Sequence, residues 1–310
     1  MKKLNNTWLI AALVVLVGAF FISRFFRAPG LESNLRQQLV QLDTAAITQL
    51  RVRPASGGEE ISLQREGVNW KVTQGSKSAF ADRSAVNAAL SSLSALKPLR
   101  MVSRKKDKWN DFQVGDGGTQ VAVYEADRQE SNLHIGKTNF VQNQQGGFGG
   151  AYTYVRVGDE DEVYAIDGFL ESSFNRTYSD WRNKNFLRVS RDAVSKITFT
   201  YPADSSFVLE KKDSVWVVNG QPAAIAPVDT YLGHLAFKNL NSFADDFQPT
   251  GAAPVTIKVE ARGGPLETIE GWPLPNGQWA FRSTQQPVIF TSESSSAIQD
   301  LLRGKTYFMK

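Results

Sequence analysis

Hydrophobic and polar residues alternate in short runs along much of the chain, which is typical of strands with one buried face. The run Leu50-Arg51-Val52-Arg53 alternates strictly, and Ile61-Ser62-Leu63 repeats the pattern after a turn. A third run, Asn69-Trp70-Lys71-Val72, follows the Glu66-Gly67 turn. Because only short turns separate the three runs, we expect a three-stranded antiparallel meander.

A helix is expected after the meander. Asp82 can cap its start by accepting a backbone N–H, and Lys97-Pro98 can end it. Between these positions Val86, Leu90 and Leu93 fall on one helical face. Further alternating runs predict later strands at 119–124, 133–135, 152–157 and 163–166.

The same order of elements recurs later in the chain. Leu50 and Trp70 recur as Ile197 and Trp216, 147 and 146 residues later. At an offset of 147, a second helix is expected over 229–240. Separately, a last helix is expected near 294–302. We therefore predict an α+β protein of two tandem repeats, each an antiparallel sheet with one packed helix. The repeats would cover residues 45–180 and 181–310.

The pattern also predicts the core of each repeat. The two recurring tryptophans stand beside Val72 and Val218, on the apolar side of their strands. We expect them to pack in the cores rather than to stack on a sugar. The predicted core residues are Trp70, Trp216, Leu90, Leu93, Phe237 and Leu240.

The N-terminal 30 residues have a different character. Residues 4–23 contain no charged side chain, and as a helix they would span about 30 Å, the thickness of a bilayer core. The exit Ser23-Arg24-Phe25-Phe26-Arg27 is bulky and basic, unlike the small residues at a signal-peptidase site. We therefore expect residues 1–30 to be an uncleaved membrane anchor, with a cleaved signal peptide as the alternative.

The next segment, residues 31–44, reads as an amphipathic helical linker. Leu31, Leu35, Leu39 and Leu42 would form one stripe on a helix that starts after Pro29-Gly30. The stripe covers three turns. It could pack on the first repeat or hold a partner helix.

Charge and composition exclude several classes of function. The net charge of +4 equals the contribution of Lys2, Lys3, Arg24 and Arg27, so the remainder of the chain is neutral. A neutral globular part offers no field for nucleic acid. The absence of Cys excludes disulfides, thiolate zinc sites and a Cys nucleophile, and with two His no His-rich metal centre is expected.

Four groupings resemble known chemistry without meeting its requirements. Gly136-Lys137-Thr138 lacks the earlier glycine of a phosphate-binding loop. The acidic run 159–162 lacks the spacing of a calcium loop, and Asp245-Asp246 would point to opposite sides of an extended chain. Neither His134 nor His234 has neighbours that suggest a triad. We predict no catalytic, nucleotide, metal or cofactor site, and not an enzyme.

One glycine-rich loop is a candidate for partner contact. Gly146-Gly147-Phe148-Gly149-Gly150 is followed by Tyr152 and Tyr154, and a mobile aromatic loop can hold a partner. The alternative is a plain hairpin tip in which glycines supply positive φ. We name Phe148, Tyr152 and Tyr154 as the candidate contacts.

The unit resembles the bacterial family catalogued as domain of unknown function 4340. The resemblance is carried by 68–72 with its Trp, the Asp-started helix 82–96, the strand end Leu133-His134-Ile135-Gly136, and the junction 180–187. It covers about residues 45–310, in two copies. It implies a membrane-anchored extracytoplasmic protein, and some members are associated with ABC-type transporter complexes, including those of gliding motility.

The anchor, the repeats and the resemblance together predict a single-span protein of the inner membrane. Charges on the two sides of the span are nearly balanced, so the periplasmic orientation of the C-terminal bulk comes chiefly from the resemblance. We expect an accessory or scaffold protein that binds a membrane protein partner. The alternatives are a glycan- or peptide-binding module and, last, a hydrolytic enzyme.

Overall fold

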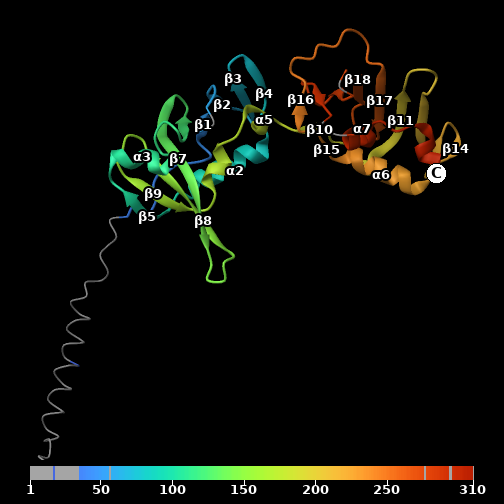
Figure 1. Cartoon of the computed structure of the whole chain (residues 1–310). Helices are drawn as coiled ribbons and strands as arrows, with labels where there is room; N and C mark the ends of the chain where they lie inside the picture. The colour runs from blue at the N-terminus through green and yellow to red at the C-terminus, as the bar shows by residue number, and fades with distance from the viewer. Residues whose placement is uncertain (1–16, 18–34, 56, 276, 293–294, 310) are drawn as a thin grey trace, which may run out of the picture. The chain divides into compact units, whose positions relative to one another are not determined.

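The computed structural model describes residues 17, 35–55, 57–275, 277–292 and 295–309 (Figure 1). They form two compact units, unit 1 with residues up to Gln64 and Asn87–Asn175, and unit 2 with Arg65–Val86 and Arg176–Lys310. Apart from Val17, the predicted anchor lies outside the described residues. No helix within the described ranges has the length and apolar character needed to cross a bilayer.

The first sheet has nine strands in the order β4-β3-β2-β1-β6-β7-β8-β9-β5. Strand β1 pairs antiparallel with β2 and β6, and the pairs β3–β4, β6–β7, β7–β8, β8–β9 and β5–β9 are antiparallel as well. The bounds are β1 (Ile47–Arg53), β2 (Ile61–Glu66), β3 (Asn69–Gln74), β4 (Lys77–Phe80), β5 (Pro98–Ser103), β6 (Thr119–Glu125), β7 (Arg128–Gln142), β8 (Phe148–Val157) and β9 (Val163–Asp167).

Alternation in β1 sets one face of this sheet. Leu50 lies opposite Leu63 on β2 and Val123 on β6, and all three are fully buried. The arginines at 51 and 53 point to the other face and are exposed. The period of two in the sequence therefore predicted both the strand and its buried face.

Helix α2 (Arg83–Ser94) begins where the sequence predicted. The Asp82 carboxylate accepts hydrogen bonds from the backbone N–H groups of Ser84 (2.8 Å) and Ala85 (3.1 Å), which caps the first turn. Leu90 and Leu93, predicted core residues, are buried in it. Trp70 on β3 is buried as well.

The expected helix over 31–44 is absent from its described part, because residues 35–44 contain no helix. Leu39 and Val40 are nonetheless buried. The Leu39 N–H donates to the Leu96 carbonyl at 2.9 Å, and Arg36 forms a 2.8 Å ion pair with Glu160. Leu39 and Val40 are therefore buried from a non-helical segment that is hydrogen-bonded to the chain just after α2. Periodicity alone cannot distinguish such a tertiary contact from a helix.

The second sheet also has nine strands, in the order β14-β13-β12-β11-β17-β18-β19-β20-β16. If the strands of each sheet are numbered from one to nine in chain order, both sheets have the same strand order, 4-3-2-1-6-7-8-9-5. The bounds are β11 (Val194–Thr200), β12 (Phe207–Lys212), β13 (Val215–Val218), β14 (Gln221–Pro222), β16 (Ser242–Phe243), β17 (Val255–Ala261), β18 (Glu267–Pro273), β19 (Trp279–Ser283) and β20 (Phe290–Thr291).

A two-stranded pair and several short helices complete the described structure. The pair is β10 (Asn185–Leu187) with β15 (Lys238–Asn239). The helices are α3 (Trp109–Phe112), α4 (Leu170–Phe174), α5 (Tyr178–Trp181), α6 (Ile225–Ala236) and α7 (Ser295–Leu301), with 3-10 turns at Lys106–Lys108, Arg191–Ala193 and Lys305–Met309. The protein is therefore α+β, with mostly antiparallel sheets and a few helices, as predicted.

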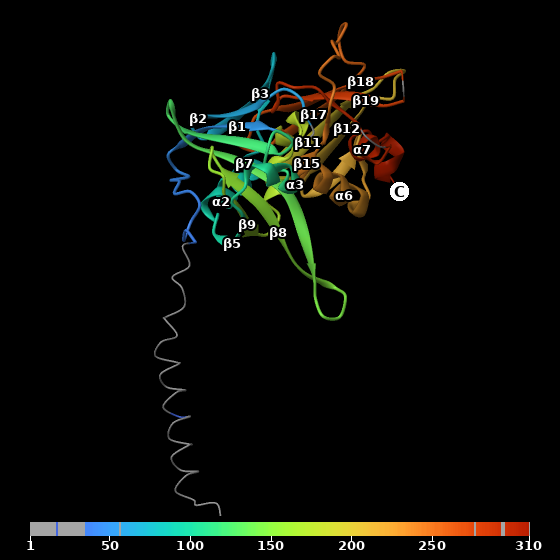
Figure 2. The same cartoon turned by 60° about the vertical axis from the view of Figure 1, so that its left-hand side comes forward.

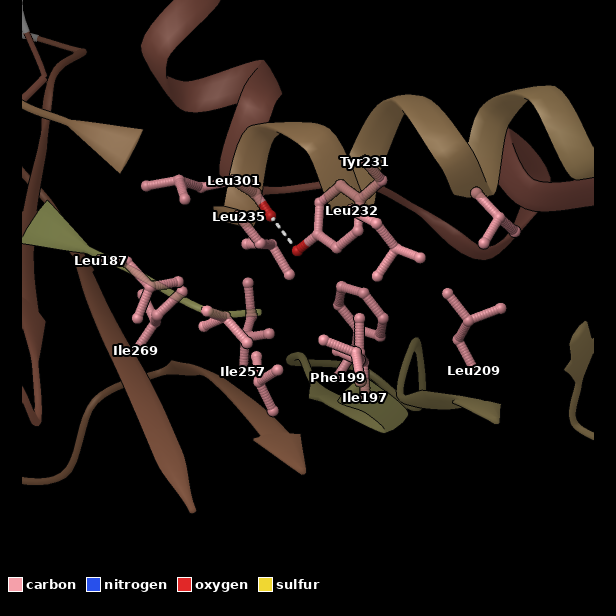
Figure 3. Close-up of a cluster of buried hydrophobic side chains, with 14 of the residues drawn as sticks. Leu187, Ile197, Phe199, Leu209, Tyr231, Leu232, Leu235, Ile257, Ile269 and Leu301 are labelled. Carbon is pink, nitrogen blue, oxygen red and sulfur yellow. Dashed lines mark hydrogen bonds between the residues drawn. The ribbon is translucent and has the colours of Figure 1, made fainter. Parts of the chain in front are cut away.

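The core of unit 2 lies between α6 and the second sheet (Figure 3). Tyr231 on α6 is fully buried against Phe199 of β11, and its hydroxyl donates to the Leu301 carbonyl at 2.9 Å. That bond satisfies the one polar atom of a large buried side chain and ties α6 to the end of α7. Burial raises the pKa of the Tyr231 hydroxyl well above its usual value.

The predicted helix at 229–240 was misplaced. Helices α2 and α6 start at Arg83 and Ile225, 142 residues apart, whereas the preceding strands β1 and β11 are 147 apart. Strand β14 has two residues against four in β4, so the chain reaches α6 sooner. Phe237 consequently follows the helix and is 78% exposed, so it is not a core residue. Leu240 is buried beyond the helix end, and Trp216 is only half-buried.

Candidate functional site

Strands β7 and β8 continue as a two-stranded ribbon beyond the rest of unit 1, which both views show (Figures 1 and 2). Asn139 lies opposite Tyr152, and Phe140 lies opposite Ala151. Because side chains alternate along a strand, these two pairs occupy opposite faces of the ribbon. One face carries phenylalanine and the other carries tyrosine and amide groups.

The phenylalanine face continues into the segment that follows β9. Phe169 stacks on Phe148, with ring centroids 6.1 Å apart and planes 17° apart, and contacts Phe140 at 5.9 Å. The exposed fractions are 67% for Phe140, 64% for Phe148 and 47% for Phe169. We call these three residues the phenylalanine patch. Exposed apolar rings gathered on one surface are typical of interaction sites.

Hydrogen bonds at the base of the ribbon fix the position of Phe169. The Thr153 hydroxyl donates to the Gly168 carbonyl at 2.8 Å and accepts from the Leu170 N–H at 3.1 Å. Gly168 has φ +86°, a left-handed conformation that glycine adopts without strain. Phe169 is therefore held against the ribbon by buried polar contacts.

The opposite face holds a polar aromatic cluster. The Asn139 amide donates to the Tyr152 hydroxyl at 2.7 Å, and the Arg100 guanidinium lies 4.9 Å from the Tyr152 ring centre. A hydrogen bond from Tyr154, followed by the one from Asn139, lowers the pKa of Tyr152. Burial raises the pKa of Tyr154 to about 12. The cluster presents hydrogen-bonding groups on this face of the ribbon.

The three predicted contact residues therefore lie in three different environments. Phe148 is exposed in the patch, Tyr152 is half-buried on the other face, and Tyr154 is buried against Phe112, with ring centroids 4.7 Å apart. Tyr154 is thus not available as a surface contact. The sequence analysis missed Phe140 and Phe169, although a Phe after the polar run 137–139 and a second one after Gly168 were visible signals.

The ribbon ends in a turn built by its own polar side chains. The Asn143 carboxamide oxygen accepts from the N–H groups of Gln145 (3.0 Å) and Gly147 (2.8 Å). Gly146 has φ +79°, as a hairpin tip requires. The tip residues 142–145 are uncharged and polar, and the patch begins beside them, where Phe148 lies opposite Gln142, and continues along the flank of the ribbon.

The residues that the structure describes in unit 2 include no such ribbon. The hairpin of β18 and β19 pairs from Ile269–Ser283 to Pro273–Trp279 and then turns. The pairs Thr138–Thr153 to Gln142–Phe148 in unit 1 continue past the corresponding point. The nine-stranded sheet of unit 2 is complete without this extension, so the fold does not require it.

The segments set aside in the sequence analysis have structural roles. A Cβ added to Gly136 would lie 2.0 Å from the Phe112 carbonyl oxygen, so this glycine permits close packing of the α3 loop. The acidic run 159–162 forms the turn between β8 and β9, where Glu160 pairs with Arg36. The described residues include no group of three or more His, Asp or Glu that could hold a metal ion.

His134 and His234 are in different environments. His134 on β7 is buried, and burial followed by the charge of Arg156 lowers its pKa to about 4. His234 on α6 lies 3.5 Å from the carboxylate of Asp300, which also binds Lys238 at 2.7 Å. The contacts of Asp300 with His234 and Lys238 join α6, β15 and α7.

A comparison with protein families gives one match. The family model described as domain of unknown function DUF4340 matches residues 70–255, more than half of the chain. No curated protein and no solved structure matches the chain.

Proposed function

The chain belongs to the DUF4340 family, and from that premise we propose that it is a membrane-anchored accessory protein that binds a membrane protein through the phenylalanine patch. The observation that carries the proposal is a set of three solvent-exposed rings, two on the ribbon and one, Phe169, packed against it from the segment after β9. Aromatic side chains supply large contact area at low entropy cost and dominate the energetics of many interfaces.

The chemistry of the ribbon favours a protein over a lipid surface as the occupant. A hairpin that inserts into lipid has apolar residues at its tip, whereas residues 142–145 here are Gln, Asn, Gln and Gln. A patch on the flank can pack against the side of a protein while the tip remains solvated. The occupant is then an apolar surface on the extramembrane part of another protein.

The N-terminal sequence supports a partner in the same membrane. Residues 4–23 are uncharged and long enough to span a bilayer, and residues 24–34 separate that span from the first described residues of unit 1. An anchored protein meets membrane partners at a high effective concentration. We place the bulk of the chain on the periplasmic side of the inner membrane, with an ABC-type transporter complex as the partner class.

We also propose that the two sheets arose from tandem repeats. Their strand orders agree, and buried residues of β1 (Ile47, Leu50, Val52) recur in β11 as Val194, Ile197 and Phe199. In this reading one repeat acquired the ribbon and the other kept the plain hairpin. After the duplication, one copy gained a surface for partner contact and the other retained the plain sheet.

Co-purification from detergent-solubilised membranes tests the function. The patch variant combines Phe140→Ser, Phe148→Ser and Phe169→Ser. The control combines Val68→Ser, Val215→Ser and Ile225→Ser, three apolar residues that are 75%, 54% and 77% exposed outside the patch. We expect one membrane protein to co-purify with the wild type and the control and to be lost with the patch variant.

Two results would contradict the proposal. Retention of the same partner by the patch variant would exclude the patch as the contact. If no membrane protein is captured, and a soluble glycan instead raises the melting temperature of the wild type, the protein is a glycan-binding module.

A further inference from the structure

A second site with binding chemistry lies in unit 2. A cavity of about 310 Å³ is lined by Ser78 on β4, by Arg182, by residues 244, 245 and 247–249 after β16, by Arg282 on β19 and by residues 287–289 before β20. Its volume is at the lower end of small-ligand sites, about the space of two amino-acid residues and too small for a large cofactor.

Arg182 provides the polar wall of this cavity. Its guanidinium is almost completely buried, lies 3.5 Å from the centre of the Phe243 ring, and donates through Nη1 to the Asp245 carboxylate at 2.8 Å. The Nε–H of Arg182 is buried and has no acceptor among the residues that the structure describes. A buried donor without an acceptor is unfavourable. The Arg182 side chain borders the cavity, so a ligand oxygen at this wall would face a hydrogen-bond donor group.

The charges around the cavity favour a neutral ligand. Arg182 is paired with Asp245, and Arg282 is paired with Glu270 at 2.6 Å. Each guanidinium thus has its own carboxylate, and an incoming anion would meet the Asp245 carboxylate beside Arg182. An uncharged carbonyl oxygen can accept from Arg182 without that repulsion.

The remaining wall is apolar. Phe247, Pro249 and Val288 line the cavity and are half-buried, and the ring of Phe247 lies 5.9 Å from that of Trp272. Such a wall suits an aliphatic or aromatic side chain. A carbonyl oxygen beside an apolar side chain is the repeating chemistry of an extended peptide.

We propose that this cavity binds an extended, uncharged segment of a polypeptide, with a main-chain carbonyl accepting from Arg182 and an apolar side chain against Phe247 and Val288. The site belongs to unit 2 and does not depend on the phenylalanine patch. It gives the protein a sequence-selective contact in addition to the surface contact of the ribbon.

Blocked tripeptides test the proposal on the full-length protein in detergent. The set carries N-acetyl and C-amide groups and has Leu, Phe, Lys or Glu at the central position. We expect the Leu and Phe peptides, at about 10 mM, to raise the melting temperature and the Lys and Glu peptides to have little effect.

Two tryptophan variants localise the binding. Gln248→Trp changes an exposed residue at the wall of the cavity, and Gln221→Trp changes an exposed residue of β14 outside it. We expect Gln248→Trp to weaken binding at least about tenfold and Gln221→Trp to leave it unchanged. Binding that is insensitive to Gln248→Trp, stronger binding of the Glu peptide, or no binding by any peptide would each overturn the proposal.

Discussion

The guanidinium of Arg156 lies 3.8 Å from the centre of the Trp109 ring, and both residues belong to unit 1. Arg156 on β8 is buried, and it donates to the carbonyls of Val114 at 3.0 Å and of Gly158. Trp109 in turn donates from its indole N–H to the Asp161 carbonyl at 3.3 Å. The Arg156 guanidinium thus packs on the Trp109 ring and donates to two loop carbonyls. These contacts hold the loop 109–118 against the sheet.

Arg156→Met is therefore expected to free this loop. Methionine retains much of the apolar volume but leaves two carbonyls without a donor, at about 1–3 kcal/mol each. Amide hydrogen exchange in 109–118 should accelerate strongly. Lys106→Ala, which removes an exposed cation 5.3 Å from the same ring, should change it little. Equal exchange rates in Arg156→Met and the wild type would show that Arg156 does not hold the loop.

His134 makes unit 1 sensitive to acid. Its pKa is lowered to about 4 in the folded protein, so between pH 6.5 and 4 the unfolded chain binds a proton that the folded chain does not. The stabilising contribution is complete above about pH 6.5 and is lost as the pH falls toward 4. From pH 7 to pH 5 this one group should lower the free energy of unfolding by about 2 kcal/mol.

Urea unfolding at several pH values measures this effect. His134→Gln removes the titrating group, so its free energy of unfolding should vary less between pH 7 and pH 5 than that of the wild type. An unchanged pH dependence in His134→Gln would assign the acid sensitivity to other groups.

Gly136→Ala should destabilise the protein without changing any charge. The new Cβ would lie 2.0 Å from the Phe112 carbonyl oxygen, which is backbone and cannot rotate away. We expect a loss of about 2 kcal/mol or more in the free energy of unfolding, as for other overpacking substitutions. Gly117→Ala is the control, because no atom lies within 4 Å of its added Cβ. If both variants unfold at the same urea concentration, the close approach does not constrain this position.

The sequence predicted those parts of the fold that depend on local patterning. Alternation located β1, β2 and β3, and Asp82 located the start of α2, because these signals act over a few residues. The predicted position of α6 was wrong because we applied one constant offset between the repeats, although β14 is shorter than β4. Phe237 therefore lies in solvent instead of the core.

The candidate site was harder to predict. The glycine-rich loop pointed to Phe148, but the patch also needs Phe140 from the paired strand and Phe169 from beyond β9. Which residues of the two strands share a face depends on the register of β7 with β8. The local pattern of hydrophobic and polar residues does not reveal that register. Burial of Tyr154 depends on the α3 loop that covers it, which is a tertiary contact.

Site-specific photocrosslinking in intact cells tests whether the phenylalanine patch contacts a membrane protein. Benzoylphenylalanine replaces Phe148 in the patch or, as the control, Val141, which is 44% exposed on the opposite face of the ribbon. We expect a crosslink from position 148 to one membrane protein and none to that protein from position 141. Equal crosslinking from both positions, or no adduct from position 148, would contradict it.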